Sequence, residues 1–198
     1  ARLVAKGYKV AICEQMEDPA AAKGIVRRDV IRVITPGTVI ESSMLDESKN
    51  NYLASVCATN GNVGMCFIDI STGEVNLTEF NENVEQRVIN EMGRYNPTEI
   101  ILNKEVVSFN SLKDFISKKL EAAVELLIEE FEFSNAELLC KEHFNTNDLT
   151  TLSLNQRDTA VCALGAALSY LKSTQKRDLE NIKNINFYTD AKFMSLGI

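Results

Sequence analysis

Short runs of apolar residues, separated by turn-forming residues, divide most of the chain into expected strands and helices. Three such runs follow one another closely at residues 52–58, 63–70 and 74–80. Asn60-Gly61 separates the first two runs and is typical of a tight β-hairpin turn, and Ser71-Thr72-Gly73 closes the second hairpin. The pattern therefore predicts three antiparallel strands joined by short turns.

A regular alternation of helices and strands is expected after these three strands. Apolar residues recur at helical spacing over 84–92, and Asn96-Pro97 ends that helix. The next expected elements are a buried strand at 99–102, a helix that begins at Ser111 and a strand at 125–131. A long helix over residues 156–172 has an apolar stripe wide enough to pack against a sheet, and its Gly165 lets a neighbour approach closely.

This element order is that of the ribonuclease H-like fold. Three antiparallel strands lead into a helix, a strand, a helix and a strand, and a long helix closes the domain. The sequence therefore predicts an α/β protein. It should hold a ribonuclease H-like mixed five-stranded sheet flanked by helices, preceded by a short fragment of a second α/β domain.

The first forty residues show a simpler pattern than the rest of the chain. Residues 8–15 indicate a short, mostly buried strand, and residues 30–34 indicate a second strand rich in β-branched residues. The second strand ends at Thr35-Pro36-Gly37-Thr38. Proline followed by glycine suits the two central positions of a type II turn, which we expect there.

These patterns suggest four parts. Residues 1–39 belong to one domain, and the polar residues 40–50 form a linker. Residues 51–173 form the main domain, and residues 174–198 lead out of it through one more β-like run at 185–188. The chain has no initial Met and ends without a helix stop signal, so we expect it to be an internal piece of a longer protein.

Composition excludes several classes of protein. The hydrophobic and charged fractions, 45% and 25%, are those of a soluble globular domain. No apolar run reaches the roughly 20 residues of a membrane span, and no secretory signal begins the chain, so we expect a cytoplasmic protein with no membrane partner. The five cysteines include no C-x-x-C pair and are expected to be mainly core thiols. A zinc site is not expected beside a single histidine. No phosphate-binding glycine loop occurs, so no cofactor is expected in this chain.

Positive charge is concentrated at the start of the chain. The formal net charge is -7, yet residues 1–40 contain seven basic and four acidic residues. Clustered cations are what DNA phosphates bind. The candidate phosphate contacts are therefore Lys23, Arg27, Arg28 and Arg32, with an ordinary solvated face as the alternative reading.

Asp69 is the residue with the best position for catalysis, because it ends an apolar strand in a fold whose enzymes bind metals with carboxylates. Two-metal chemistry needs several converging carboxylates, and the available Glu129 and Glu130 sit in an exposed-looking alternation. We therefore expect Asp69 and Thr72 to hydrogen-bond backbone amides within the hairpin. We predict no catalytic residue and no metal ligand.

Three stretches of the chain resemble the MutS family of DNA mismatch-repair proteins. Residues 10–19, VAICEQMEDP, and the positions from Ala22-Lys23-Gly24 to Thr35-Pro36-Gly37-Thr38 are similar to the end of that family's mismatch-binding domain. Residues 69–74, DISTGE, resemble the hairpin of its connector domain. Residues 193–196 look like the start of its lever domain, although Gly197 stands where the family continues with Asp.

The resemblance covers essentially the whole chain and implies a connector module. This module would relay ATP-driven conformational change between lever and mismatch domain and would contact the partner MutL. The parent would be a homodimer on mismatched double-stranded DNA and a DNA-dependent ATPase, whose ATP and Mg sites lie in a domain absent here. Phe80-Asn81-Glu82 spells the family's Phe-x-Glu wedge, but that wedge lies near the family's N-terminus, so we take the match as chance.

Two other functions fit parts of the sequence. One is a ribonuclease H-like metal-dependent nuclease, which would use Asp69. The other is a MutS paralogue in recombination control. Such paralogues commonly lack the mismatch-binding domain, so the pattern in residues 1–40 speaks against the second.

Overall fold

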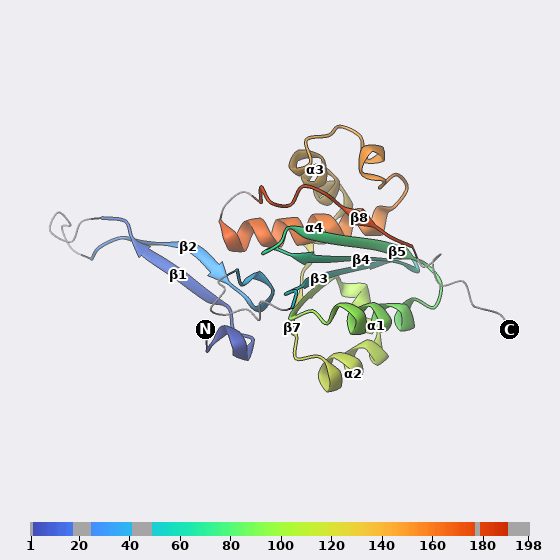
Figure 1. The fold of residues 1–198 in the computed structure, drawn as a ribbon, viewed down its shortest axis with the longest axis horizontal. Coiled ribbons are helices and arrows are strands. Elements are labelled where there is room, and N and C mark those ends of the chain that lie inside the picture. Colours follow the sequence, from blue (N-terminus) through green and yellow to red (C-terminus); the bar gives the residue numbers. More distant parts are fainter. Residues whose placement is uncertain (1, 18–24, 41–48, 177–178, 190–198) are drawn as a thin grey trace.

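A six-stranded mixed sheet forms the centre of the protein in the computed structural model, which describes residues 2–17, 25–40, 49–176 and 179–189 (Figure 1). The strands lie in the order β7-β6-β3-β4-β5-β8. Their bounds are β3 Leu53–Thr59, β4 Asn62–Asp69, β5 Glu74–Phe80, β6 Glu99–Leu102, β7 Ala123–Leu126 and β8 Asn186–Phe187. Strands β3, β4 and β5 pair antiparallel, whereas β6, β7 and β8 each join the sheet in parallel.

Helices cover both faces of this sheet. Two of them, α1 Val84–Tyr95 and α2 Asn110–Lys119, lie on one face, and α3 Phe133–His143 and α4 Asp158–Gln175 lie on the other (Figure 1). Alternate residues of a strand point to opposite faces, so Ile100 packs toward α1 whereas Ile101 packs toward α4. The sheet therefore separates two hydrophobic cores.

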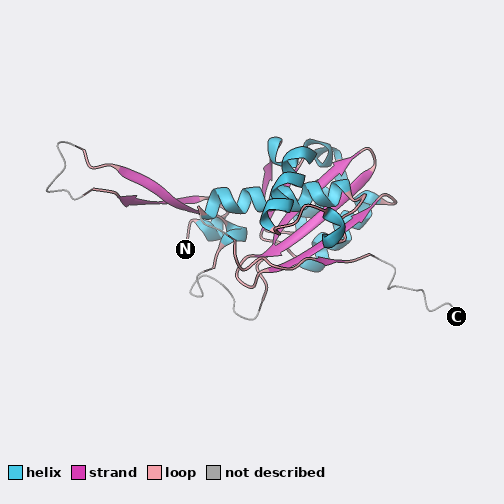
Figure 2. Ribbon diagram, turned by 90° about the horizontal axis from the view of Figure 1, so that it is seen from above, coloured by secondary structure: helices cyan, strands magenta, loops and turns pink. Residues whose placement is uncertain are grey.

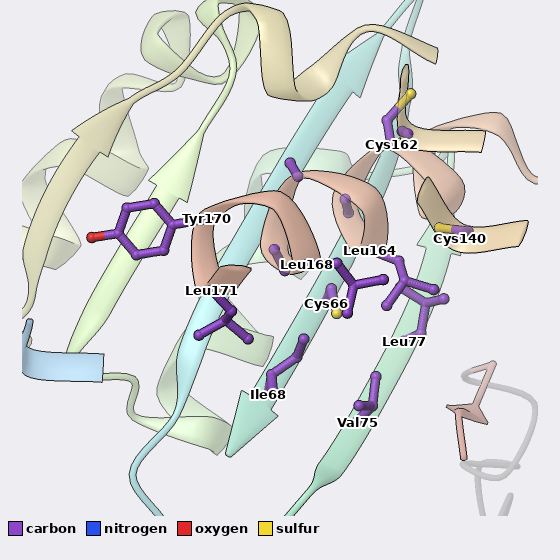
Figure 3. Packing of buried hydrophobic residues seen from close by; sticks show 14 of the residues in the cluster. Cys66, Ile68, Val75, Leu77, Cys140, Cys162, Leu164, Leu168, Tyr170 and Leu171 are labelled. Carbon is purple, nitrogen blue, oxygen red and sulfur yellow. The ribbon is translucent and has the colours of Figure 1, made fainter. Parts of the chain in front are cut away.

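The long helix α4 is buried over most of its circumference. Its leucines pack on the apolar residues of β4 and β5 (Figure 3). A Cβ atom on Gly165 would lie only 2.4 Å from the Cα of Ala136 in α3. The predicted role of this glycine is confirmed, since it lets α3 lie directly against α4.

A two-stranded arm extends away from the sheet (Figures 1 and 2). It consists of β1 Val10–Gln15 and β2 Arg28–Ile34, which pair antiparallel. The predicted strands are confirmed, but β1 is mostly exposed rather than mostly buried. A small cluster of Val4, Ile34 and Val39 closes the base of the arm.

The sheet differs from the prediction in the number and bounds of its strands. The prediction of five strands was wrong, because the β-like run at 185–188 supplies β8 along β5 as a sixth. The strand expected at 125–131 is β7, which ends at Leu126, and Glu129–Phe131 forms a 3-10 turn instead. Helix α3 was not predicted, because polar residues interrupt its apolar positions.

Two local expectations were also wrong. The Pro36–Thr38 segment forms a 3-10 turn rather than a type II turn, and Gly37 does not have positive φ. The second helix begins at Asn110, and Ser111 does not cap it. The amide of Ser111 instead donates to the carboxylate of Glu85 in α1 at 2.5 Å. Four of the cysteines are buried thiols as expected, whereas Cys13 on β1 is exposed.

Candidate functional site

A buried carboxylate connects the arm to the sheet. Glu99, the first residue of β6, is 1% exposed. One of its oxygens accepts hydrogen bonds from the Thr35 hydroxyl at 2.5 Å and from the Gly37 amide at 2.8 Å. The other oxygen accepts one from the hydroxyl of Tyr170 in α4. We call these four residues the Glu99 joint, because they join three segments that are far apart in the sequence.

The close fit of this joint explains the glycine in the turn. A Cβ atom on Gly37 would lie 2.9 Å from the Cβ of Glu99 and 3.2 Å from the Cβ of Leu53. The turn is also closed on itself, since the Thr35 amide donates to the Thr38 hydroxyl at 2.9 Å. Burial raises the pKa of the Tyr170 hydroxyl, so this group stays a neutral donor to Glu99. The joint is therefore a buried, fully paired polar contact.

Side chains around the joint make further bonds between the arm and the main domain. The side-chain nitrogen of Asn51 donates to the Pro36 carbonyl at 2.9 Å, and its side-chain oxygen accepts from the Thr98 hydroxyl at 2.7 Å. Arg32 on β2 donates to the side-chain oxygen of Gln175, the last residue of α4, at 3.0 Å. The base of the arm is thus bonded to both the sheet and α4.

A second set of contacts holds the chain where it leaves the sheet after β8. The Tyr188 amide donates to the Leu77 carbonyl at 2.9 Å, and the Tyr188 hydroxyl donates to Glu91 of α1 at 2.6 Å. Its ring lies 6.3 Å from the ring of Tyr95, which stacks on Phe67 at 4.0 Å. The outgoing chain is therefore anchored to α1.

Tyr52 belongs to the same aromatic cluster, since its ring lies 5.1 Å from the ring of Tyr95, and its burial predicts a loss of stability at alkaline pH. Burial raises the pKa of Tyr52 from 10.0 to about 12. The unfolded chain loses that proton near pH 10 while the folded protein keeps it. The free energy of unfolding should therefore hold below pH 10 and fall as the pH rises toward 12.

This alkaline loss can be measured by urea denaturation at a series of pH values. The Tyr52→Phe variant serves as control, because it lacks the titrating hydroxyl and should lose less stability over the same range. Equal losses in the two proteins would show that Tyr52 is not responsible.

The structure describes three of the four candidate phosphate contacts. Arg27 and Arg28 are exposed on the arm, and Arg27 pairs with Asp29 at 3.0 Å. Arg32 is turned toward the joint, where it bonds Gln175 and the Thr38 carbonyl. Lys23 lies outside the described residues. The structure thus gives Arg32 a position between the arm and α4 that spacing alone did not reveal.

Asp69 is engaged within the hairpin that follows β4. Its carboxylate accepts hydrogen bonds from the Ser71 backbone amide at 2.9 Å, the Ser71 hydroxyl at 2.6 Å and the Asn51 backbone amide at 3.1 Å. The Thr72 hydroxyl accepts from the Glu74 amide at 3.2 Å. The expected hairpin role of both side chains is confirmed. Across the described parts of the chain, no group of three or more His, Cys, Asp or Glu is placed to hold a metal ion.

The side chain of Phe80 is likewise occupied by the fold. It is buried in the core on the α1 side, and the Arg87 guanidinium lies 4.2 Å from its ring centre. A wedge against a base pair needs an exposed ring, so Phe80 is not placed to act as one.

Family comparison identifies the chain. The family model described as MutS domain II matches residues 51–183. The chain belongs to the MutS family. The model described as MutS domain I matches residues 1–43, so the arm and the Thr35–Thr38 turn fall in a different MutS domain from Glu99. The Glu99 joint therefore lies between two MutS domains.

Relatives in several bacteria match the chain over nearly its whole length. The protein named DNA mismatch repair protein MutS from Ruminiclostridium cellulolyticum is 46% identical over 99% of this chain. The proteins of the same name from Alkaliphilus metalliredigens and Clostridioides difficile are each 44% identical over 100% of it. The chain spans about a fifth of the length of these relatives, with 20% to 23% of each covered.

Neither the joint nor its central residue was found by sequence reasoning. Glu99 was assigned to a buried strand, and the one available signal was a single acid that opens the otherwise apolar run Glu99-Ile100-Ile101-Leu102. A buried acid needs donors, and these come from residues 35, 37 and 170.

Within the described residues, no helix is both long and apolar enough to span a membrane.

Proposed function

We propose that this chain is the connector of a DNA mismatch-recognition protein together with the end of its mismatch-binding domain. It would act in the cytoplasm, relaying ATP-driven rearrangement of a lever domain to the mismatch-binding domain. Membership of the MutS family supports the mismatch-repair role. We further propose that the main domain is ribonuclease H-like, which its antiparallel meander followed by parallel strands supports.

The Glu99 joint is the observation that carries the relay role. A relay must move the two domains together, and a paired buried carboxylate is costly to separate, because separation leaves polar groups without partners. Tyr170 lies near the end of α4, and Tyr188 anchors the outgoing chain to α1. A displacement that reaches the main domain from the outgoing side would therefore be passed to the arm.

Other properties of the parent are proposed from the family. The parent would be a homodimer on mismatched double-stranded DNA and would bind ATP and Mg outside this chain. No phosphate-binding loop occurs in these 198 residues, so none of them is assigned to the nucleotide. Phosphate contact is proposed for Lys23, Arg27 and Arg28, and for Arg32 only if it leaves the bonds it makes at the joint.

A MutL homologue is proposed as the protein partner of the main domain, whose surface is acidic. Titration of a labelled MutL homologue with the full-length parent should show saturable binding. Binding no stronger than to an unrelated acidic protein would contradict this part of the proposal.

The rival nuclease role has no support in the structure. The Asp69 carboxylate already accepts three hydrogen bonds. Glu129 begins a 3-10 turn and is exposed to solvent. These acids do not converge as two-metal hydrolysis requires.

The relay is tested by Glu99→Gln in the full-length parent protein. The amide keeps the volume of the side chain but replaces one acceptor oxygen with a donor that faces another donor. Binding to mismatched DNA without ATP should change little, whereas ATP-induced release from the mismatch should slow by about fivefold or more.

Two further variants make this test decisive. Thr35→Val removes one donor of the joint and should slow release in the same direction. Glu82→Gln changes an exposed carboxylate just after β5, at the end of the sheet opposite the joint, and this variant should release at the normal rate. Normal ATP-induced release in both joint variants, with both proteins folded, would refute the relay.

A further inference from the structure

A groove lies at the end of the sheet opposite the Glu99 joint. It has a volume of about 620 Å³, a size usual for ligand sites, and it is open to solvent. The carboxyl ends of β3, β6 and β7 and the first turn of α4 form its walls. Its lining residues relevant here are Glu79, Lys104, Glu105, Ile128, Glu132 and Asp158.

The walls of the groove are fixed by hydrogen bonds. The Asn103 side chain accepts from the Ala58 amide at 3.0 Å and donates to the Ala58 carbonyl at 2.8 Å, which ties the end of β6 to β3. The Glu79 carboxylate accepts from the Thr159 hydroxyl at 2.7 Å and from the Ala160 amide at 3.0 Å. These bonds hold the end of β6 against β3 and the end of β5 against the start of α4.

The floor of the groove exposes large apolar side chains. Ile128 is 66% exposed and Phe133 is 38% exposed. Ile128 continues a row of half-exposed residues, Val124 and Leu126, along the edge strand β7. Exposed apolar side chains beside a polar rim are a usual mark of an interaction surface.

The rim of the groove is acidic. Four carboxylates, those of Glu79, Glu105, Glu132 and Asp158, line it beside one ammonium, that of Lys104. Such a rim attracts cationic groups and repels acidic ones, and it disfavours nucleic acid. The floor adds a requirement for an apolar side chain.

We propose that this groove binds an extended basic peptide segment whose central apolar side chain covers Ile128 and Phe133. Lysine or arginine residues on either side of that anchor pair with Glu105 and Glu132. The site is separate from the Glu99 joint and does not rest on the relay, so either proposal can fail without the other.

The probe is a short fluorescein-labelled peptide with a Phe-Leu pair flanked by lysine and arginine. Fluorescence anisotropy with the 198-residue chain should show saturable binding that weakens as salt is added. The same peptide with glutamate in place of its basic residues, or with serine in place of Phe-Leu, should bind at least about fivefold more weakly.

Matched variants locate the binding site. Glu105→Lys and Ile128→Ser should each weaken binding by about fivefold. Their controls are Glu121→Lys, an exposed acid outside the groove, and Leu138→Ser, an apolar side chain on α3 that is 59% exposed. All four positions are exposed, so thermal melts should confirm folded proteins. No saturable binding, or equal losses in groove and control variants, would overturn the proposal.

Discussion

Replacing Gly64 with alanine is expected to lower the free energy of unfolding by about 3 kcal/mol or more. A Cβ atom on Gly64 would lie 2.1 Å from the carbonyl oxygen of Thr159 and 2.4 Å from the amide nitrogen of Ala160. Both atoms belong to the backbone of α4, so no side chain can rotate away. β4 cannot retreat either, because it is paired on both sides.

Urea denaturation gives this change in free energy, and a second glycine supplies the control. Gly93 lies within α1, and a Cβ atom there would be 3.5 Å from the Phe115 ring, an ordinary contact. Gly93→Ala should therefore raise the free energy of unfolding by roughly 0.5–1 kcal/mol. A Gly64→Ala protein as stable as the original would show that α4 and β4 are less closely packed than described.

Replacing Glu99 with alanine should produce a loss of similar size, about 3 kcal/mol. The Thr35 hydroxyl, the Gly37 amide and the Tyr170 hydroxyl would lose their common acceptor in a buried place. An unsatisfied buried donor costs about 1–3 kcal/mol, and entry of water into the new space offsets part of the sum.

Hydrogen exchange distinguishes this loss from a general weakening of the core. Amides of β1 and β2 should exchange faster in Glu99→Ala, whereas those of β4 and β5 should follow the global stability alone. Glu121→Ala should stay within about 0.5 kcal/mol of the original protein. Unchanged exchange in the arm would mean that Glu99 does not hold it.

Much of the main domain could be predicted because its elements are set by local patterns. The meander 52–80 follows from its short apolar runs and from Asn60-Gly61, where both residues have positive φ as a tight hairpin turn requires. α4 follows from the length and width of its apolar stripe. These features need only neighbours in the sequence.

The errors arose where distant residues decide the structure. Pro36-Gly37 looked like a type II turn, but Gly37 is needed for its close approach to Glu99 and Leu53 rather than for positive φ. The two residues of β8 become a strand only because β5 offers a free edge. Asp69 was correctly placed in its hairpin because its main partners are two residues away.

The candidate site was largely invisible for the same reason. Glu99 and Tyr170 are 71 positions apart, and no short motif joins them. Arg32 was grouped with Arg27 and Arg28 by its spacing, while its position is set by Gln175 at the far end of α4. The sequence shows that these three residues are positively charged, but only the fold shows which groups each of them contacts.

Because α4 is enclosed between α3 and the sheet, we expect it to behave as a rigid helix. Its 18 residues extend for about 27 Å. Asp158, at the start of α4, lines the groove, and Tyr170, near the end of α4, belongs to the Glu99 joint. Because α3 and the sheet pack against the middle of α4, this helix has little freedom to bend and would move as a rigid unit. One rigid helix thus spans the distance between the groove and the base of the arm.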